Sequence, residues 1–378
     1  MAIDPARRRW VQRSAALFGA MTLPVEFAVA RAGVQGRPAA SRSEWPALLA
    51  SWQRRGTYYA GLWRVGESVS GIALPSRAHG LALDPRDANR AIVVARRPGD
   101  WLMRFSVRGE LEPLIASTDE NRVFNGHAAF SANGDTLYTS ENDVDDGSGI
   151  IGVRDPATLE KRAELATHGI GPHELLVELD GTLLVANGGI LTVPEMGRAK
   201  LYLGAMDPSL VRIDARDGRL LEQWRLPDAR LSIRHLARAP DGGVGIALQA
   251  EHPTREERER APLLAIFDGA SLQLAAAPPD ADLRGYGGDV ACIVANGATR
   301  FAVSCPRAGR IAWWDSAGPW RGSAPLRDAC ALAPCGEALI AVGEGGDFAR
   351  LAVRGDELRA AAPAGIKWDN HAVALLRV

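Results

Sequence analysis

The sequence predicts an all-β fold, a seven-bladed β-propeller, from three observations. The chain of 378 residues consists of short apolar strands separated by turns. Its 40 glycines and 23 prolines are spread along the chain instead of being pooled in a linker, as is typical of many strands joined by tight turns. A unit of about 49 residues recurs seven times, which matches the roughly 40–50 residues of a four-stranded propeller blade.

Each repeat begins with a polar residue, usually histidine, that is followed by an apolar strand and a turn. The seven units start at His79, His127, His173, His235, Asp289, Asp328 and His371. A second strand is expected at 91–95, 136–140, 182–186, 244–248, 301–305 and 338–342. A third strand is expected at 101–105, 150–153, 210–213, 263–267, 310–314 and 349–353, before a weaker outer fourth strand.

The seventh unit contains only its inner strand, and its missing strands are expected at 58–63 and 68–74. The ring then closes by pairing of N-terminal outer strands with the C-terminal inner strand, which removes exposed sheet edges. An amphipathic helix is expected near 45–52. A six-bladed ring and a two-domain β protein are the alternatives. Insertions at 188–209 and 249–261 are expected to form loops on one face, where binding functions commonly reside.

Composition and charge restrict the function. Hydrophobic residues make up 47% and charged residues 24% of the chain, as in ordinary globular proteins. Lys and Arg number 44 and Asp and Glu 45, so no bulk positive field is available to hold a nucleic acid, and we expect no nucleic-acid partner. The sequence contains no Gly-x-Ser-x-Gly, HExxH or P-loop motif that would indicate a hydrolase or a nucleotide-binding protein.

The N-terminus predicts export. Arg7, Arg8 and Arg9 precede a moderately apolar stretch, a layout that is typical of a signal peptide, and the residue order resembles a twin-arginine signal. We therefore expect a twin-arginine signal peptide at 1–32, a single propeller domain at 33–378, a periplasmic location and no membrane association after signal removal. A short amphipathic helix or a retained anchor is the alternative.

The four cysteines leave their pairing open. They are Cys292, Cys305, Cys330 and Cys335. A periplasmic location permits disulfides, and four cysteines allow three pairings between which the sequence does not decide.

Five of the seven histidines occupy one position of the repeat. The inner strand of each blade lines the central channel, and blade seven adjoins blade one, so these side chains are expected to form one arc at a channel mouth. Neutral imidazole is the usual ligand of copper, zinc and iron. The predicted metal ligands are His79, His127, His173, His235 and His371.

The second strands return to the same mouth, and polar residues follow them directly. Such groups orient ligands and bound molecules. The predicted cofactor-binding residues are Arg97, Glu141, Asn142, Asn187 and Gln249. Two alternatives stay open for the histidines: they satisfy hydrogen bonds in buried turns, or they transfer protons in catalysis.

Several segments resemble one known family. These are Phe-Asn-Gly-His-Ala-Ala-Phe at 124–130, Leu-Tyr-Thr-Ser-Glu-Asn-Asp at 137–143, and further strings at 167–175, 185–190, 231–237 and 368–371. They resemble exported proteobacterial proteins grouped as domain of unknown function 1513. The resemblance implies a twin-arginine-exported propeller encoded near imelysin-like and di-haem-peroxidase-like proteins in iron-responsive clusters. It implies no known reaction, and Asp289 departs from the serine more common in the family.

Three functional hypotheses follow from these patterns. The leading one is a periplasmic protein that binds a transition metal, iron or copper with zinc as a third option, or a small metal complex, in iron or copper handling. The second is a metal-dependent enzyme, an oxidoreductase or a lactonase-like propeller, in which Glu141 or a histidine acts as base. The third is a scaffold that docks an imelysin-like or di-haem partner.

Overall fold

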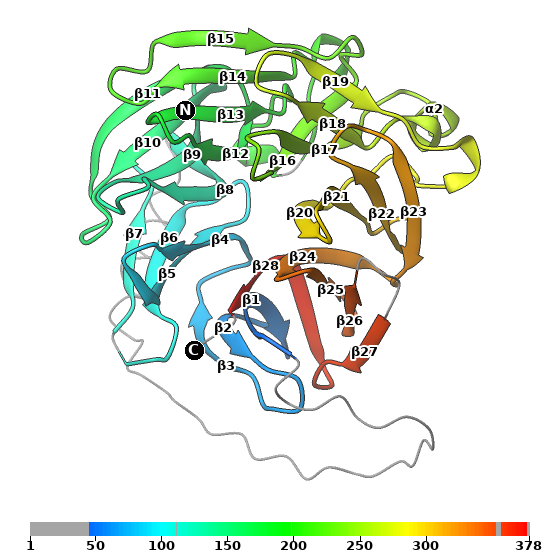
Figure 1. The fold of residues 1–378 in the computed structure, drawn as a ribbon. Coiled ribbons are helices and arrows are strands. Elements are labelled where there is room, and N and C mark those ends of the chain that lie inside the picture. The colour runs from blue at the N-terminus through cyan, green and yellow to red at the C-terminus, as the bar shows by residue number, and fades with distance from the viewer. Residues whose placement is uncertain (1–44, 111, 198, 353–356, 376–378) are drawn as a thin grey trace.

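The computed structural model describes residues 45–110, 112–197, 199–352 and 357–375. They form seven four-stranded antiparallel sheets, arranged as blades in a ring (Figure 1). The seven-bladed β-propeller predicted from the repeat is confirmed. The predicted signal peptide at 1–32 and the first residues of the predicted domain, 33–44, lie outside the described residues.

Each blade runs from an inner strand to an outer strand, in chain order for the first six blades. In order they are β4 (Ala78–Asp84), β5 (Asp87–Ala95), β6 (Trp101–Ser106), β7 (Leu114–Ser117); β8 (Arg122–Phe130), β9 (Leu137–Asp143), β10 (Ser148–Arg154), β11 (Lys161–Ile170); β12 (Pro172–Val177), β13 (Thr182–Asn187), β14 (Ser209–Asp214), β15 (Leu220–Trp224); β16 (Leu231–Arg238), β17 (Val244–Ala250), β18 (Leu264–Phe267), β19 (Leu272–Ala275); β20 (Asp289–Ala295), β21 (Ala298–Cys305), β22 (Arg310–Asp315), β23 (Trp320–Pro325); and β24 (Ala329–Cys335), β25 (Ala338–Gly343), β26 (Asp347–Ala352), β27 (Glu357–Ala361).

The seventh blade joins the two ends of the chain. It has the order β28 (Ile366–Leu375), β1 (Ala47–Arg54), β2 (Thr57–Trp63) and β3 (Ser70–Leu74). The predicted closure is confirmed, and aromatic rings stabilise it: Trp368 packs 5.8 Å from Trp52 and 5.4 Å from Trp63 between ring centroids.

The prediction of a helix near 45–52 is wrong. This segment is β1, which pairs with β2 on one side and β28 on the other. Its first six residues are all buried. A strand buried on both faces has a continuous apolar run, which periodicity alone does not distinguish from a buried helix. Here the tertiary pairing decides the conformation.

Apolar side chains between neighbouring blades hold the inner strands in place. Between the fourth and fifth blades, for example, Phe301 is fully buried and packs with Ala247 and Leu264. Gly245 allows this contact, since a Cβ atom there would lie 2.4 Å from Phe301 Cδ1. Such close packing resists displacement, so residues on the inner strands are held in fixed positions.

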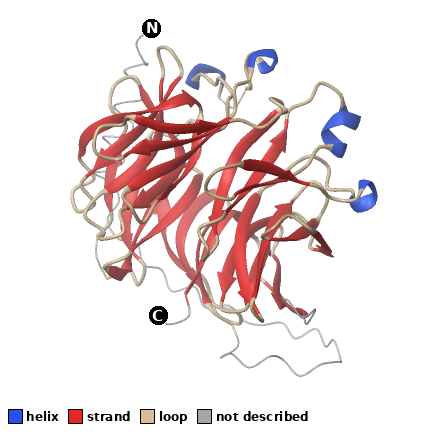
Figure 2. Cartoon of the chain, turned by 45° about the horizontal axis from the view of Figure 1, so that its top comes forward, coloured by secondary structure: helices blue, strands red, loops and turns tan. Residues whose placement is uncertain are grey.

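The described helices are short and lie on one face of the ring (Figure 2). They are η2 (Pro194–Met196), η3 (Leu203–Ala205), α2 (Arg255–Arg260) and η4 (Pro279–Ala281). The first two belong to the predicted insertion at 188–209 and α2 to the one at 249–261, so both insertions reach the same face. None of the helices in the described residues has the length and apolarity to cross a membrane.

Candidate metal centre

A β-bulge places each of the five ring histidines. In four blades the register between the inner and second strands shifts at the histidine, between Ala78 and Leu81, Phe124 and Ala128, Pro172 and Leu175, and Ile233 and Leu236. In the closing blade the shift lies between Ala50 and Trp52 of β1, opposite the segment of β28 that holds His371. A bulge leaves residues unpaired and increases the local twist. His127, His235 and His371 therefore lie inside strands that begin at Arg122, Leu231 and Ile366, and not at the strand starts expected from the repeat.

Two glycines let neighbouring inner strands approach at this level. Gly126 has a φ of +104°, and a Cβ atom there would lie 2.6 Å from Cδ2 of His79. At Gly80 a Cβ atom would lie 2.5 Å from the carbonyl oxygen of Gly126. Side chains at either position would collide with the next blade, so the two glycines allow His79 and His127 to approach each other.

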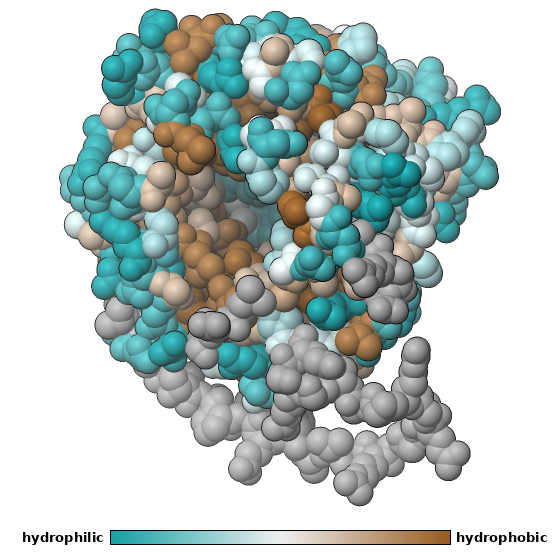
Figure 3. Space-filling view, in the orientation of Figure 1, coloured by the Kyte–Doolittle hydropathy of each residue, from teal (hydrophilic) through white to brown (hydrophobic). Residues whose placement is uncertain are grey.

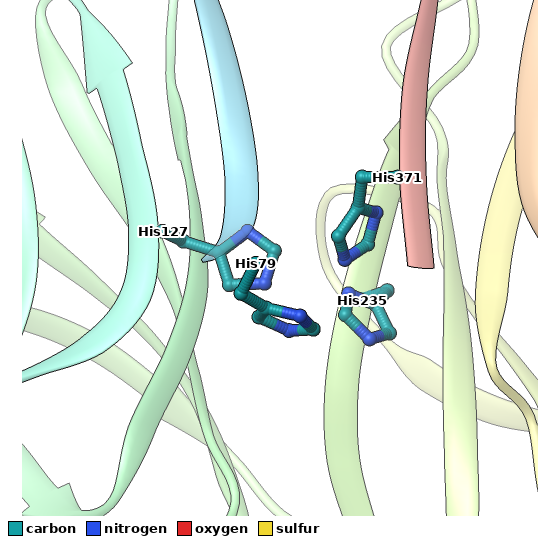
Figure 4. Close-up of side chains that lie close together, drawn as sticks. All are labelled: His79, His127, His235 and His371. Carbon is teal, nitrogen blue, oxygen red and sulfur yellow. The ribbon is translucent and has the colours of Figure 1, made fainter. Parts of the chain in front are cut away.

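The five imidazoles form one compact cluster, called here the histidine cluster. Ring centroids lie 4.7 Å apart for His371 and His79, 4.8 Å for His79 and His127, 4.7 Å for His127 and His173, and 4.6 Å for both His173 with His235 and His235 with His371. Ligand nitrogens of His79, His127, His235 and His371 all lie within 4.8 Å of one another. Figure 4 shows these four rings gathered from opposite sides of the channel.

His173 completes the cluster. Its Nε2 atom lies 3.4 Å from Nε2 of His79 and 3.3 Å from Nε2 of His235. The arc of ring histidines predicted from the repeat is thus present. The two other histidines lie elsewhere: His168 Nε2 contacts the Gly218 carbonyl oxygen, and His252 pairs with Asp228.

Burial keeps most of the cluster neutral. It lowers the pKa of His79, His127, His173 and His235 well below 6.5, and in each of them neighbouring histidines lower it further. His371 is the exception: burial lowers its pKa, but Asp289, with smaller contributions from Glu174 and Asp369, raises the pKa above its usual value. A neutral imidazole keeps one nitrogen lone pair for a metal ion.

Two carboxylates orient imidazoles of the cluster by contacting their Nδ1 atoms. Glu174 Oε2 lies 3.2 Å from Nδ1 of His235, and Asp289 Oδ1 lies 3.3 Å from Nδ1 of His371. A carboxylate on Nδ1 fixes the tautomer that leaves Nε2 as the ligand atom. Glu174 was not among the residues expected from the sequence. It directly follows His173 and would point the other way in a regular strand, but the bulge changes this alternation.

The two remaining blades contribute no imidazole. Asp289 begins β20 and also accepts a hydrogen bond from the Leu332 backbone amide at 2.9 Å. Asp328 precedes β24, and the bulge of that blade holds Cys330 between Ala329 and Ala331. All four cysteines are free thiols, and the Cys330 thiol donates to the carbonyl oxygens of Val342 and Asp369.

The five predicted cofactor-binding residues separate into two groups. Arg97 and Gln249 line the pocket next to the histidine cluster. Asn142 accepts a hydrogen bond from Asn125, which lines the pocket itself, and Asn187 donates to the Thr167 carbonyl oxygen. The structure gives these two amides partners within the fold, away from the pocket wall.

Glu141 does not reach the pocket. It is fully buried in β9, and Arg154 and Lys161 each bind one of its carboxylate oxygens at 2.8 Å. The expectation that Glu141 faces the channel mouth is corrected here. Thr139 and Arg154 hold its carboxylate within its own blade.

The pocket over the histidine cluster has a volume of about 390 Å³. Its lining residues are His79, Arg96, Arg97, Asn125, His173, Lys200, Arg234, His235, Gln249, Tyr286, Arg307 and Asn370. Figure 3 views the ring from the opposite face, away from the short helices, where the ring is also hollowed at its centre and apolar side chains lie along part of the rim. Lys200, Arg234 and Tyr286 were not among the residues that the sequence singled out.

Comparisons with known proteins agree with the fold. The chain belongs to the family described as "Protein of unknown function (DUF1513)", whose model matches residues 72–375. No curated protein matches the chain. A chain of Kuenenia stuttgartiensis hydrazine synthase is similar at 16% identity and a TM-score of 0.55, over 88% of this chain and 100% of that one. A chain of a mitotic checkpoint complex is similar at 13% identity and a TM-score of 0.58, over 94% of each chain. At such identities the likeness concerns the fold alone.

Proposed function

We propose that this member of the DUF1513 family binds a transition metal, iron or copper with zinc as a third option, at the histidine cluster, and that it handles the metal or a small metal complex in the periplasm. One observation carries the proposal. Three buried imidazoles and the partly buried imidazole of His371, from four blades, bring ligand nitrogens within 4.8 Å of one another, and a fifth, His173, adjoins two of them.

The spacing of the nitrogens suits a metal ion. A tetrahedral ion bound by imidazole at about 2.0–2.1 Å holds its ligand nitrogens roughly 3.3–3.4 Å apart. His173 Nε2 lies 3.4 Å from His79 Nε2 and 3.3 Å from His235 Nε2. These two spacings match those between the ligands of a tetrahedral ion.

Buried nitrogens without a hydrogen-bond partner support the same conclusion. His127 Nε2 and His371 Nε2 are buried and have no such partner. Buried polar atoms are nearly always satisfied, and an unsatisfied one costs roughly 1–3 kcal/mol. Coordination of a metal by these nitrogens would remove that cost.

The donor set favours a transition metal over calcium or magnesium. The clustered donors are imidazole nitrogens, which suit iron, copper and zinc, whereas calcium and magnesium prefer oxygen ligands. The nearby carboxylates of Glu174 and Asp289 meet Nδ1 atoms of His235 and His371. They act on the imidazoles, as carboxylates behind metal-bound histidines usually do.

The enzymatic alternative loses one of its candidate bases. Glu141 is fixed by Arg154 and Lys161 and lies outside the pocket lining. A metal-dependent enzyme would have to use a residue of the pocket or of the histidine cluster itself, and steady turnover of a metal-loaded protein would favour it over a binding protein.

The test is metal analysis of the full-length protein purified from the periplasm, followed by calorimetric titration of the metal-free protein with Cu(II), Zn(II) and Fe(II). We expect about one metal per chain. His127→Ala and His235→Ala should each lower the affinity at least 10- to 100-fold, because even the loss of residues behind the ligands commonly costs that much.

The matched control is His252→Ala, which removes a histidine paired with Asp228 outside the cluster and should leave the affinity unchanged. Stoichiometry well below one in the wild type, with a loss of thermal stability in His127→Ala, would instead support histidines that only satisfy the fold.

A further inference from the structure

The charged residues that line the pocket over the histidine cluster are all positive, apart from the histidines themselves. Five of its lining residues are arginine or lysine, and none is aspartate or glutamate among the described residues. The cationic residues are Arg96, Arg97, Lys200, Arg234 and Arg307. The chain as a whole carries a net charge of −1, so this concentration of positive charge is local.

The cations reach the pocket from several blades. Arg96 and Arg97 follow β5, Arg307 follows β21, and Arg234 precedes His235 on β16. Lys200 comes from the insertion between β13 and β14. Arg307 is exposed, Lys200 and Arg97 are partly buried, and Arg234 is buried. Positive charge therefore extends from the opening of the pocket to the level of the histidine cluster.

Two of these cations pair with nearby carboxylates. Asp369 pairs with Arg96 at 3.0 Å, and Glu251 pairs with Lys200. The Arg307 guanidinium lies 4.4 Å from the centre of the Tyr286 ring, which holds it over the pocket. Burial lowers the pKa of Lys200 although Glu251 opposes this shift, and Arg234 and Arg307 lower it further.

A positive lining disfavours a bare metal cation and favours an anion. Guanidinium groups recognise carboxylates and phosphates by paired charge-assisted hydrogen bonds. The volume of about 390 Å³ is enough for one small molecule beside the histidines, within the usual range of ligand pockets. Gln249, Asn370 and Tyr286 add uncharged polar groups to the lining.

We propose that this pocket binds a small, multiply charged oxyanion, a polycarboxylate or a condensed phosphate, directly over the histidine cluster. Resting on the proposed function, the inference adds that the metal is held together with this anion, so the cargo is an anionic metal complex. The histidines bind the metal from below, and the cationic residues bind the oxygens of its anionic ligand.

The experiment uses the full-length, metal-free protein and titrates it calorimetrically with citrate and, separately, with pyrophosphate. We expect one anion per chain and an affinity that falls with added salt. Arg307→Gln and Arg97→Gln should each weaken binding of the anion about 10-fold or more, since a hydrogen bond to a charged group contributes about that much. Both variants should bind free Cu(II) or Zn(II) at least as well as the wild type.

Arg216→Gln is the control, because Arg216 is 86% exposed and pairs with Asp214 outside the pocket. It should not change either affinity. Binding of citrate alone assigns a polycarboxylate, and binding of pyrophosphate alone assigns a condensed phosphate. Anion binding without metal binding would keep the anion site but refute the metal proposal, and with it the anionic metal complex as cargo. Metal binding with neither anion bound, or anion binding that both pocket variants leave unchanged, would overturn the inference.

Discussion

Replacing Arg154 by methionine should strongly destabilise the protein without removing the proposed metal site. Arg154 is 2% exposed and its guanidinium lies 2.8 Å from the carboxylate of Glu141, which is fully buried. It also donates to the Leu159 carbonyl oxygen and lies over the Phe124 ring. Methionine keeps much of the side-chain volume but leaves Glu141 with Lys161 as its remaining cationic partner.

The expected cost is about 3 kcal/mol. Breaking a buried ion pair by removing one partner costs roughly 3–5 kcal/mol, because a buried charge is left uncompensated. Lys161 Nζ stays 2.8 Å from the other carboxylate oxygen, which places the value at the lower end. At about 2–4 °C per kcal/mol for a large domain, the melting temperature should fall by about 6–12 °C.

Chemical denaturation of the metal-free protein measures this cost. Glu141→Leu combined with Arg154→Met should recover part of it, because replacing a buried pair by apolar residues is often neutral. Arg255→Ala is the control: its ion pair with Glu259 is exposed, and its loss should change stability by about 0.5 kcal/mol or less.

Metal titration of these variants, and of Glu141→Gln, separates a structural role of Glu141 from a role in metal binding. If Arg154→Met costs less than about 1 kcal/mol, the buried pair is not the structural element described above. If Glu141→Gln abolishes metal binding at unchanged stability, Glu141 belongs to the metal site after all.

Four further outcomes are expected. The metal-free protein should lose stability as pH falls below 6.5, because four clustered histidines resist protonation when folded while the unfolded chain takes up protons. The loss should reach up to about 1.4 kcal/mol per histidine and pH unit. Urea denaturation should therefore give a lower free energy of unfolding at pH 5.5 than at pH 8. Gly126→Ala, which places a Cβ atom 2.6 Å from His79 Cδ2, should weaken metal binding at least about 10-fold by calorimetry, as losses around metal ligands do. Burial raises the pKa of the Cys305 thiol to about 12, so alkylation at pH 8 should label it only after denaturation. Replacing Arg7 and Arg8 by lysine should retain the protein in the cytoplasm on cell fractionation, and normal periplasmic accumulation would contradict the twin-arginine prediction.

The repeat made the ring and its histidines predictable. One polar position recurring at blade spacing was enough to place five imidazoles on consecutive inner strands, because every blade repeats the same geometry about one axis. The conformation at 45–52 was not predictable in the same way. Its apolar run suits a helix or a buried strand, and only the distant partner β28 decides between them.

The roles of the acidic residues depended on details that periodicity does not contain. Glu174 reaches His235 because of a bulge, and bulges interrupt the alternation on which strand predictions rely. Glu141 and Gln249 both follow apolar residues of a second strand. Glu141 nevertheless forms an ion pair with Arg154 on the neighbouring strand. Lys200 comes from an insertion, whose path over the pocket follows from no repeat.

The two blades without a ring histidine show why the donors of the cluster are imidazole nitrogens alone. At Cys330, burial raises the pKa of the thiol, which donates to two backbone carbonyl oxygens and is thus a packed, neutral group. At Asp289, one carboxylate oxygen accepts the Leu332 amide and the other meets His371 Nδ1. The aspartate, which begins β20 of the fifth blade, therefore ties this blade to the sixth and the seventh and fixes which nitrogen of His371 faces the other imidazoles. In this arrangement the carboxylate takes part in the site by orienting a neighbouring histidine, and the donors of the cluster remain nitrogen atoms.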